Sequence, residues 1–90
     1  MEAEERSEEE RRFNDEVVLL EGLYGFHPEA FRMLPSHDLE SLTLYYNLGG
    51  DSSDIFAYRN SVIANHPGIE ERAHIAARAV VLELGLDAAF

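Results

Sequence analysis

The chain has 90 residues, of which 46% are hydrophobic, and a formal net charge of −11. That length supports one small hydrophobic core and excludes a second domain of ordinary size. The chain contains no cysteine, which excludes disulfides and cysteine-based metal or catalytic sites. All seven basic residues are arginines, and the excess of acidic residues disfavours binding to the phosphate backbone of a nucleic acid.

No stretch is apolar enough to cross a membrane, and the Glu-rich N-terminus lacks the apolar segment of a signal peptide. We therefore expect a cytoplasmic protein without a membrane partner. The absence of lysine indicates either a GC-rich genome, which favours arginine codons, or a salt-rich cytoplasm, in which acidic surfaces are common. Glutamate outnumbers aspartate by 13 to 5, which favours the first explanation.

Residues 1–12 form an acidic N-terminal extension that contains six glutamates and three arginines. Glutamates and arginines four positions apart stabilise a helix, and a helical pattern continues directly behind the extension. We therefore expect a helical or frayed extension over residues 1–12 and a single helical domain over residues 13–90.

The first helix of that domain is predicted by apolar residues at helical spacing, namely Phe13, Val17, Leu20 and Tyr24. Gly22 and Gly25 are stop signals, which indicate that the helix ends near one of them. Pro28 and Pro35 then bound a second helix of about two turns. Proline suits the first turn of a helix and disfavours helical conformation in the residue before it.

Capping and turn residues bound the next two helices. Ser36 is a suitable N-cap for a helix that ends at the Asn47–Gly50 turn. Strand-forming residues occur over 42–48, but no second good strand is available to pair with them, so we predict a helix there. Asp51–Asp54 offer N-caps for the following helix, which ends at the Asn65–Gly68 turn.

The last helix shows the clearest pattern, because one apolar row runs along it: Ile69, Ala73, Ala76, Val80 and Leu84. Gly85 followed by Leu86 predicts a Schellman end, in which a glycine in the left-handed conformation terminates the helix. The predicted fold is all-α, a compact bundle of four to five short helices.

Apolar residues occupy most sides of the last helix over 75–84. This pattern is typical of a helix at the centre of a bundle or of one half of a dimer interface. On the second interpretation the chain is a homodimer. The predicted self-association residues are Ile75, Ala79, Val80, Leu82 and Leu86.

A protein partner of basic charge is the other interaction that the composition favours. Tyr45 and Tyr46 are neighbours on one helix and cannot both face inward, so we expect at least one exposed ring. Aromatic residues beside an acidic surface are common at protein interfaces. The predicted partner-binding residues are Tyr45, Tyr46, Glu8, Glu9 and Glu10.

No nucleophile elbow, phosphate loop or catalytic pair of carboxylates occurs, so we expect no enzyme activity, no catalytic residue and no cofactor. Glu71 and His74 form a Glu-x-x-His pattern, a spacing found in di-iron carboxylate bundles. Such a site would need a second copy of the chain and further glutamates. A solvated first helical turn explains the pair more simply, so we expect no metal and keep these two residues as weak candidates.

Residues 39–63 have the outline of a helix-turn-helix, with Gly49 and Gly50 in the turn. The second helix would then read DNA through Tyr58, Arg59 and Asn60. Its acidic start would repel phosphates, so nucleic acid is not the expected partner.

The function predicted from the sequence is a small acidic, non-enzymatic protein–protein interaction module, such as a regulator or an inhibitor. One alternative is a helix-turn-helix DNA-binding protein from a salt-rich cytoplasm. The other is a dimeric metal–carboxylate protein that uses Glu71 and His74.

Overall fold

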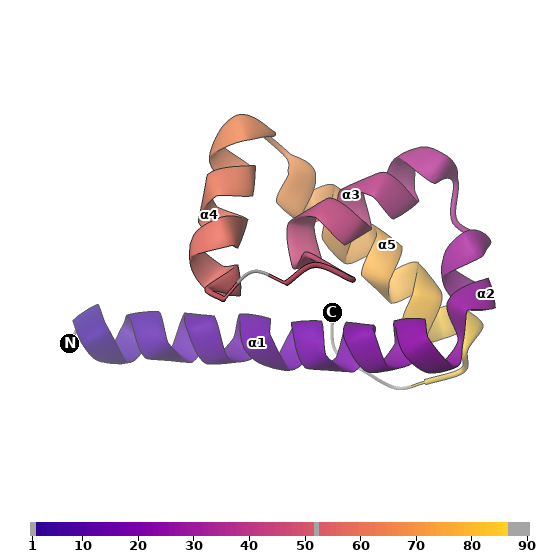
Figure 1. The fold of residues 1–90 in the computed structure, drawn as a ribbon, viewed down its shortest axis with the longest axis horizontal. Coiled ribbons are helices and arrows are strands. Elements are labelled where there is room, and N and C mark those ends of the chain that lie inside the picture. Colours follow the sequence, from indigo (N-terminus) through magenta and orange to yellow (C-terminus); the bar gives the residue numbers. More distant parts are fainter. Residues whose placement is uncertain (1, 52, 87–90) are drawn as a thin grey trace.

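The computed structural model describes residues 2–51 and 53–86, with side chains from Glu8 onward. Within these residues the chain forms helices and no strand, which confirms the predicted all-α fold (Figure 1). The helices are α1 (Glu2–Phe26), α2 (Pro28–Arg32), α3 (Ser36–Tyr46), α4 (Ile55–Asn65) and α5 (Ile69–Glu83).

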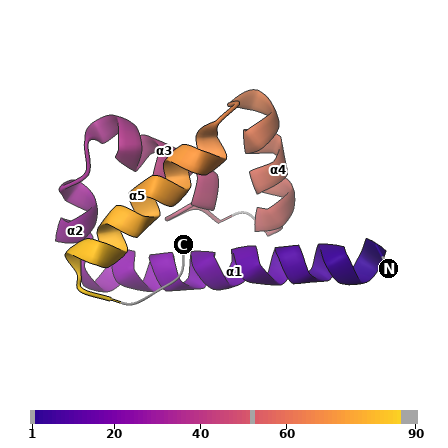
Figure 2. The ribbon, with the colours of Figure 1, turned by 180° about the vertical axis from the view of Figure 1, so that it is seen from behind.

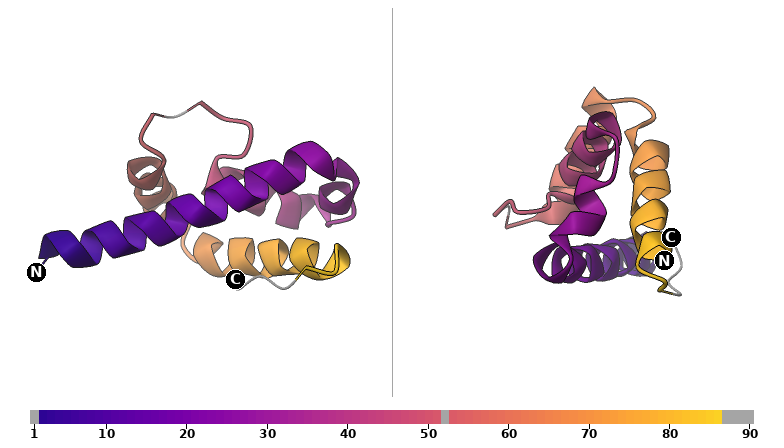
Figure 3. Two further views of the ribbon diagram at one scale, coloured as in Figure 1. Left: turned by 90° about the horizontal axis from the view of Figure 1, so that it is seen from below. Right: turned by 90° about the vertical axis from the view of Figure 1, so that its right-hand side faces the viewer.

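The long helix α1 forms the base of the bundle. Its 25 residues span about 37 Å at the usual rise per residue, against a longest molecular dimension of 40 Å. The N-terminal end of α1 extends beyond α4 (Figure 1). Figure 3 shows α5 on one side above α1 and α3 with α4 on the other, and α3 packs most extensively on α5.

Aromatic rings fill the part of the core where α1, α3 and α4 meet. The Phe13 ring stacks on Tyr46, with centroids 5.6 Å apart, and meets the edge of Tyr45 at the same distance. The Phe56 ring lies 6.2 Å from Phe13. Such tilted and edge-to-face pairs contribute about 0.5–1.5 kcal/mol each beyond the burial of their surface.

Both Tyr45 and Tyr46 are buried, with exposed fractions of 1% and 0%. The expectation that at least one of these rings is exposed is therefore wrong. A helix that packs on one side only must expose one of two neighbouring residues, but α3 is enclosed on more than one side. Tyr45 reaches a residue of α5, and Tyr46 reaches a residue of α1.

Several helix ends follow the sequence closely. The Asp54 carboxylate caps α4 by accepting a hydrogen bond of 3.1 Å from the Ala57 amide. Gly85 adopts φ +70°, and the Leu86 amide donates to the Val81 carbonyl at 3.0 Å, as expected of a Schellman end. Ser36 is instead the first residue of α3, and no side-chain cap is present there.

The first helix continues through Gly22 and ends at Phe26, one residue after Gly25. The predicted end near one of the two glycines is therefore found at Gly25 and not at Gly22, because an internal glycine only weakens a helix, by about 1 kcal/mol. Packing of the residues after Gly22 offsets that cost, since Leu23 is half-buried against the core and the Tyr24 ring meets the edge of the Phe31 ring, with centroids 5.1 Å apart.

Candidate functional site

A network of polar side chains joins α1 to the other long helices. The Tyr46 hydroxyl of α3 donates to Glu16 Oε1 of α1 at 3.0 Å. His74 Nε2 of α5 lies 3.8 Å from the same oxygen, and the Glu16 side chain is only 15% exposed. The Tyr45 hydroxyl donates to Glu70 Oε2 of α5 at 3.2 Å.

The environment of both phenols keeps them protonated. Burial raises the pKa of Tyr46 strongly, and the neighbouring Glu16 carboxylate raises it further. Burial also raises the pKa of Tyr45, where the Arg59 guanidinium opposes the shift and the Glu70 carboxylate adds to it. Both hydroxyls therefore act as hydrogen-bond donors rather than as charged groups.

Arg59 of α4 is buried, with an exposed fraction of 8%. Its guanidinium carbon lies 4.6 Å from the centre of the Phe56 ring and 5.4 Å from that of Phe13. Its Nη2 donates to Glu9 Oε1 at 3.1 Å and to Asn60 Oδ1 at 2.8 Å. The residue is thus a cation held between aromatic rings and tied to α1.

This placement removes the main support for DNA reading by α4. Arg59 does not present its guanidinium to a duplex, Asn60 accepts hydrogen bonds from Arg59, and Tyr58 is half-buried. The segment over residues 47–54 that joins α3 to α4 is also longer than the turn of about 3–4 residues in a helix-turn-helix.

A cavity of about 120 Å³ opens where the network reaches the surface. It is lined by Glu9, Arg12, Phe13, Glu16, Tyr45, Arg59, Glu70 and His74. Most of its polar groups bond to one another, so their evident role is to hold four helices together. Glu16 and Glu70 were not singled out from the sequence. Glu16 directly precedes the buried Val17, and a carboxylate at the edge of a buried row needs an internal donor.

The Glu71–His74 pair is not assembled as a metal site. Glu71 is exposed, whereas His74 lies against Glu16 on another helix. No group of three His, Cys, Asp or Glu side chains is placed to hold a metal ion within the part of the chain that the structure describes. A site shared between two copies would have to gather its ligands from both.

The self-association candidates divide into two sets. Val80 is fully buried on the inward row of α5, so its predicted place in an interface has to be corrected. The other four project outward, and Ile75, Leu82 and Leu86 are 56%, 69% and 41% exposed. Ile75, the exposed Ala79 and Leu82 follow a spacing of four and three residues, which places them on one side of α5, whereas Leu86 follows the Gly85 turn beyond the end of the helix.

The outward row Ile75, Ala79 and Leu82 lies opposite the buried row of α5. At about 100° per residue, Leu82 points away from the buried Ala73, Ala77 and Val80. In Figure 2, α5 crosses the face of the molecule with no other described helix in front of it.

Charges of both signs flank the outward row. The exposed charged residues of α5 sum to −1, whereas the whole chain carries −11; they are Glu70, Glu71, Arg72, Arg78 and Glu83. An open depression lined in part by Glu71, Ile75 and Arg78 adjoins its N-terminal half.

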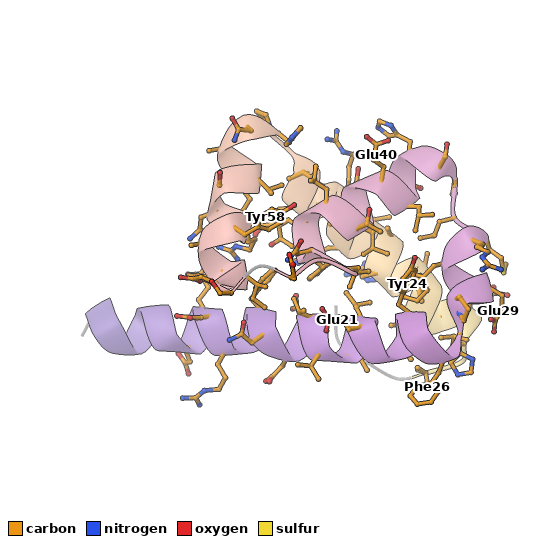
Figure 4. The ribbon with its side chains drawn as sticks, in the orientation of Figure 1. Glu21, Tyr24, Phe26, Glu29, Glu40 and Tyr58 are labelled. Carbon is orange, nitrogen blue, oxygen red and sulfur yellow. The ribbon has the colours of Figure 1, made fainter. Side chains whose placement is uncertain are left out.

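Other exposed apolar residues lie on α1. Leu19 and Phe26 are seven residues apart and share one side of that helix, Val18 lies roughly a quarter turn from them, and Phe26 is directed away from the bundle (Figure 4). Of the acidic partner-binding candidates, Glu8 and Glu9 are exposed and Glu10 is half-buried. Glu9 pairs with Arg59, so part of that predicted surface serves the fold.

No protein-family model matches the chain, and no curated protein or solved structure matches it either. Among the described helices, none has both the length and the apolar character that crossing a membrane requires. The functional interpretation therefore rests on the arrangement of the residues themselves.

Proposed function

We propose that the chain is a small, non-enzymatic protein–protein interaction module, and that the outward face of α5 is its binding surface. The observation that carries this proposal is the exposed row Ile75, Ala79 and Leu82 on α5, with the exposed Leu86 just beyond the end of that helix. Continuous exposed apolar surface on a small domain commonly marks a site of interaction with another protein. Occupation of this face would let the chain act as a regulator or an inhibitor.

The polar residues support the same proposal. Tyr45, Tyr46, Arg59 and His74 each contact a carboxylate of another helix. Since these groups serve to join helices, they are occupied within the fold, whereas Ile75 and Leu82 on the outward side of α5 are exposed.

Site-specific photocrosslinking in cells that produce the protein naturally tests this function. A photoreactive residue at Leu82 should yield a discrete adduct, because it would lie inside the interface. The same residue at Glu40, which is exposed on the outward side of α3, is the control and should yield none (Figure 4). Addition of Ile75→Glu should abolish the adduct at position 82, because an unpaired charge at an apolar interface is costly.

The proposal fails if no adduct forms at position 82. It also fails if positions 82 and 40 crosslink equally, because the contact would then not depend on the α5 face.

A further inference from the structure

We infer that the partner of the outward face of α5 is a second copy of this chain, bound antiparallel about a two-fold axis. This inference rests on the proposed function and names the occupant of the same surface. It follows from the distribution of charge, the spacing of the outward row and the size of the face.

The charge of the α5 face favours a second copy of the chain over a basic protein as the partner. Two copies of a chain with a net charge of −11 repel each other. In most relative orientations, the acidic surface of one copy would face the acidic surface of the other. On α5 the signs nearly balance, with Arg72 and Arg78 against Glu70, Glu71 and Glu83. A basic partner would gain little from a face so close to neutral, whereas an acidic copy meets little repulsion there.

The spacing of the outward row suits a symmetric pair of helices. In a two-fold dimer both subunits use the same patch, and an axis perpendicular to α5 through the middle of the row makes the paired helices run in opposite directions. Ile75 and Leu82 lie about one turn on either side of Ala79. Two α5 helices that cross at Ala79 therefore place Ile75 of each copy against Leu82 of its partner. The small side chain of Ala79 lets the two helix backbones approach closely.

The size of the α5 face determines how tightly we expect the two copies to bind. The row from Ile75 to Leu82 covers about 10 Å of helix, and an interface built on it is smaller than the roughly 800 Å² per partner of stable complexes. We therefore expect a reversible dimer that dissociates on dilution, with a dissociation constant in the micromolar range of about 1–100 μM.

Sedimentation equilibrium of the purified chain, from about 5 μM to 1 mM, measures this association over the relevant range. The wild-type mass should rise from one chain to two. Raising the salt concentration should tighten the dimer, because screening removes the repulsion between two acidic chains. A complex with a basic partner would weaken instead.

Two substitutions of matched exposure test the surface. Leu82→Glu should raise the dissociation constant about tenfold or more, because it buries a charge in the interface. Val18→Glu, at a position on α1 that is also 69% exposed, should leave association close to that of the wild type. Circular dichroism and urea denaturation establish that both variants remain folded.

A second pair of variants tests the charge argument without changing an apolar residue. Arg72→Glu and Arg32→Glu alter the net charge equally, but only Arg72 lies on the α5 face. We expect Arg72→Glu to weaken the dimer several-fold more than Arg32→Glu does.

A wild-type chain that stays monomeric at the highest concentration overturns the inference, as does equal association of Leu82→Glu and Val18→Glu. If the chain is monomeric while position 82 still crosslinks to a different protein, only the identity of the partner is wrong. If it is monomeric and no adduct forms, the proposed function fails as well.

Discussion

Two neighbouring tyrosines carry much of the specificity of the core. Tyr45 and Tyr46 are both buried, and each hydroxyl donates to a carboxylate from a different helix. A buried phenol needs such a partner, because a hydroxyl without one costs about 1–3 kcal/mol. The pair therefore ties α3 to α5 through Glu70 and to α1 through Glu16.

This arrangement predicts loss of stability at alkaline pH. The folded chain holds the pKa of Tyr45 and Tyr46 above the ordinary value of 10.0, so unfolded tyrosines release protons first as the pH rises. The stabilisation is complete below about pH 10 and is lost above it, by up to about 1.4 kcal/mol per pH unit for each tyrosine. The chain has no lysine or cysteine to titrate in this range.

Urea denaturation at several pH values from about 8 to 11 measures this dependence. Tyr46→Phe should lower the free energy of unfolding at neutral pH by about 1.5–3 kcal/mol, since it removes a hydrogen bond to a charged group. It should also reduce the slope above pH 10, and Tyr45→Phe/Tyr46→Phe should reduce it further. An undiminished slope in the double variant would contradict the role given to these phenols.

Local signals and packing compete at the ends of the helices. At Gly85 they agree, because the left-handed backbone at φ +70° suits glycine and ends α5. At Gly22 they disagree, and the helix continues through a residue that weakens it. Nothing lies within 4 Å of a Cβ placed at either glycine, so space does not decide the effect of adding one.

Substitution of the two glycines by alanine should therefore change the free energy of unfolding in opposite directions. Gly22→Ala should raise the free energy of unfolding by about 0.5–1 kcal/mol, because alanine restricts the unfolded chain and favours the helix. Gly85→Ala should lower it by about 1–2 kcal/mol, because a side chain is strained at positive φ. Chemical denaturation of both variants beside the wild type gives the two differences, and changes of the same sign would refute the argument.

For the molecule as a whole, net charge opposes compaction. The chain places −11 on a body with a radius of gyration of 12.9 Å, and few arginines offset it. Added salt screens this repulsion over the Debye length, which falls from about 30 Å at 0.01 M to about 3 Å at 1 M. The balance differs from that of a protein held together by surface ion pairs, which salt weakens.

We therefore expect the melting temperature to rise by several degrees between about 0.05 and 0.5 M sodium chloride. Since a dimer would also stabilise the fold, Leu82→Glu at low protein concentration is the control, and it should show the same trend. A melting temperature that falls with salt would mean that pairs such as Arg59–Glu9 outweigh the general repulsion.

The spacing of residues indicates which face of a helix carries Arg59 or Val80, but it does not indicate what these side chains contact. Phe56, Arg59 and Val62 are three residues apart, a spacing that places them on one face of a helix, and the structure buries all three. Arg59 also looked like a DNA-reading side chain, because a pattern reports the face of a helix and not what covers it. Val80 was assigned to an interface for the same reason, although it lies inside the bundle.

The sequence by itself determined the helices, their order and most of their ends, since periodicity, capping and turns act over a few residues. It also determined the charge that limits which surfaces can meet. Only the tertiary structure decided that α3 is enclosed on more than one side, which buries Tyr45 and Tyr46 together. Tyr46 and Glu16 lie 30 residues apart, and no local rule relates groups so distant until packing brings their helices into contact.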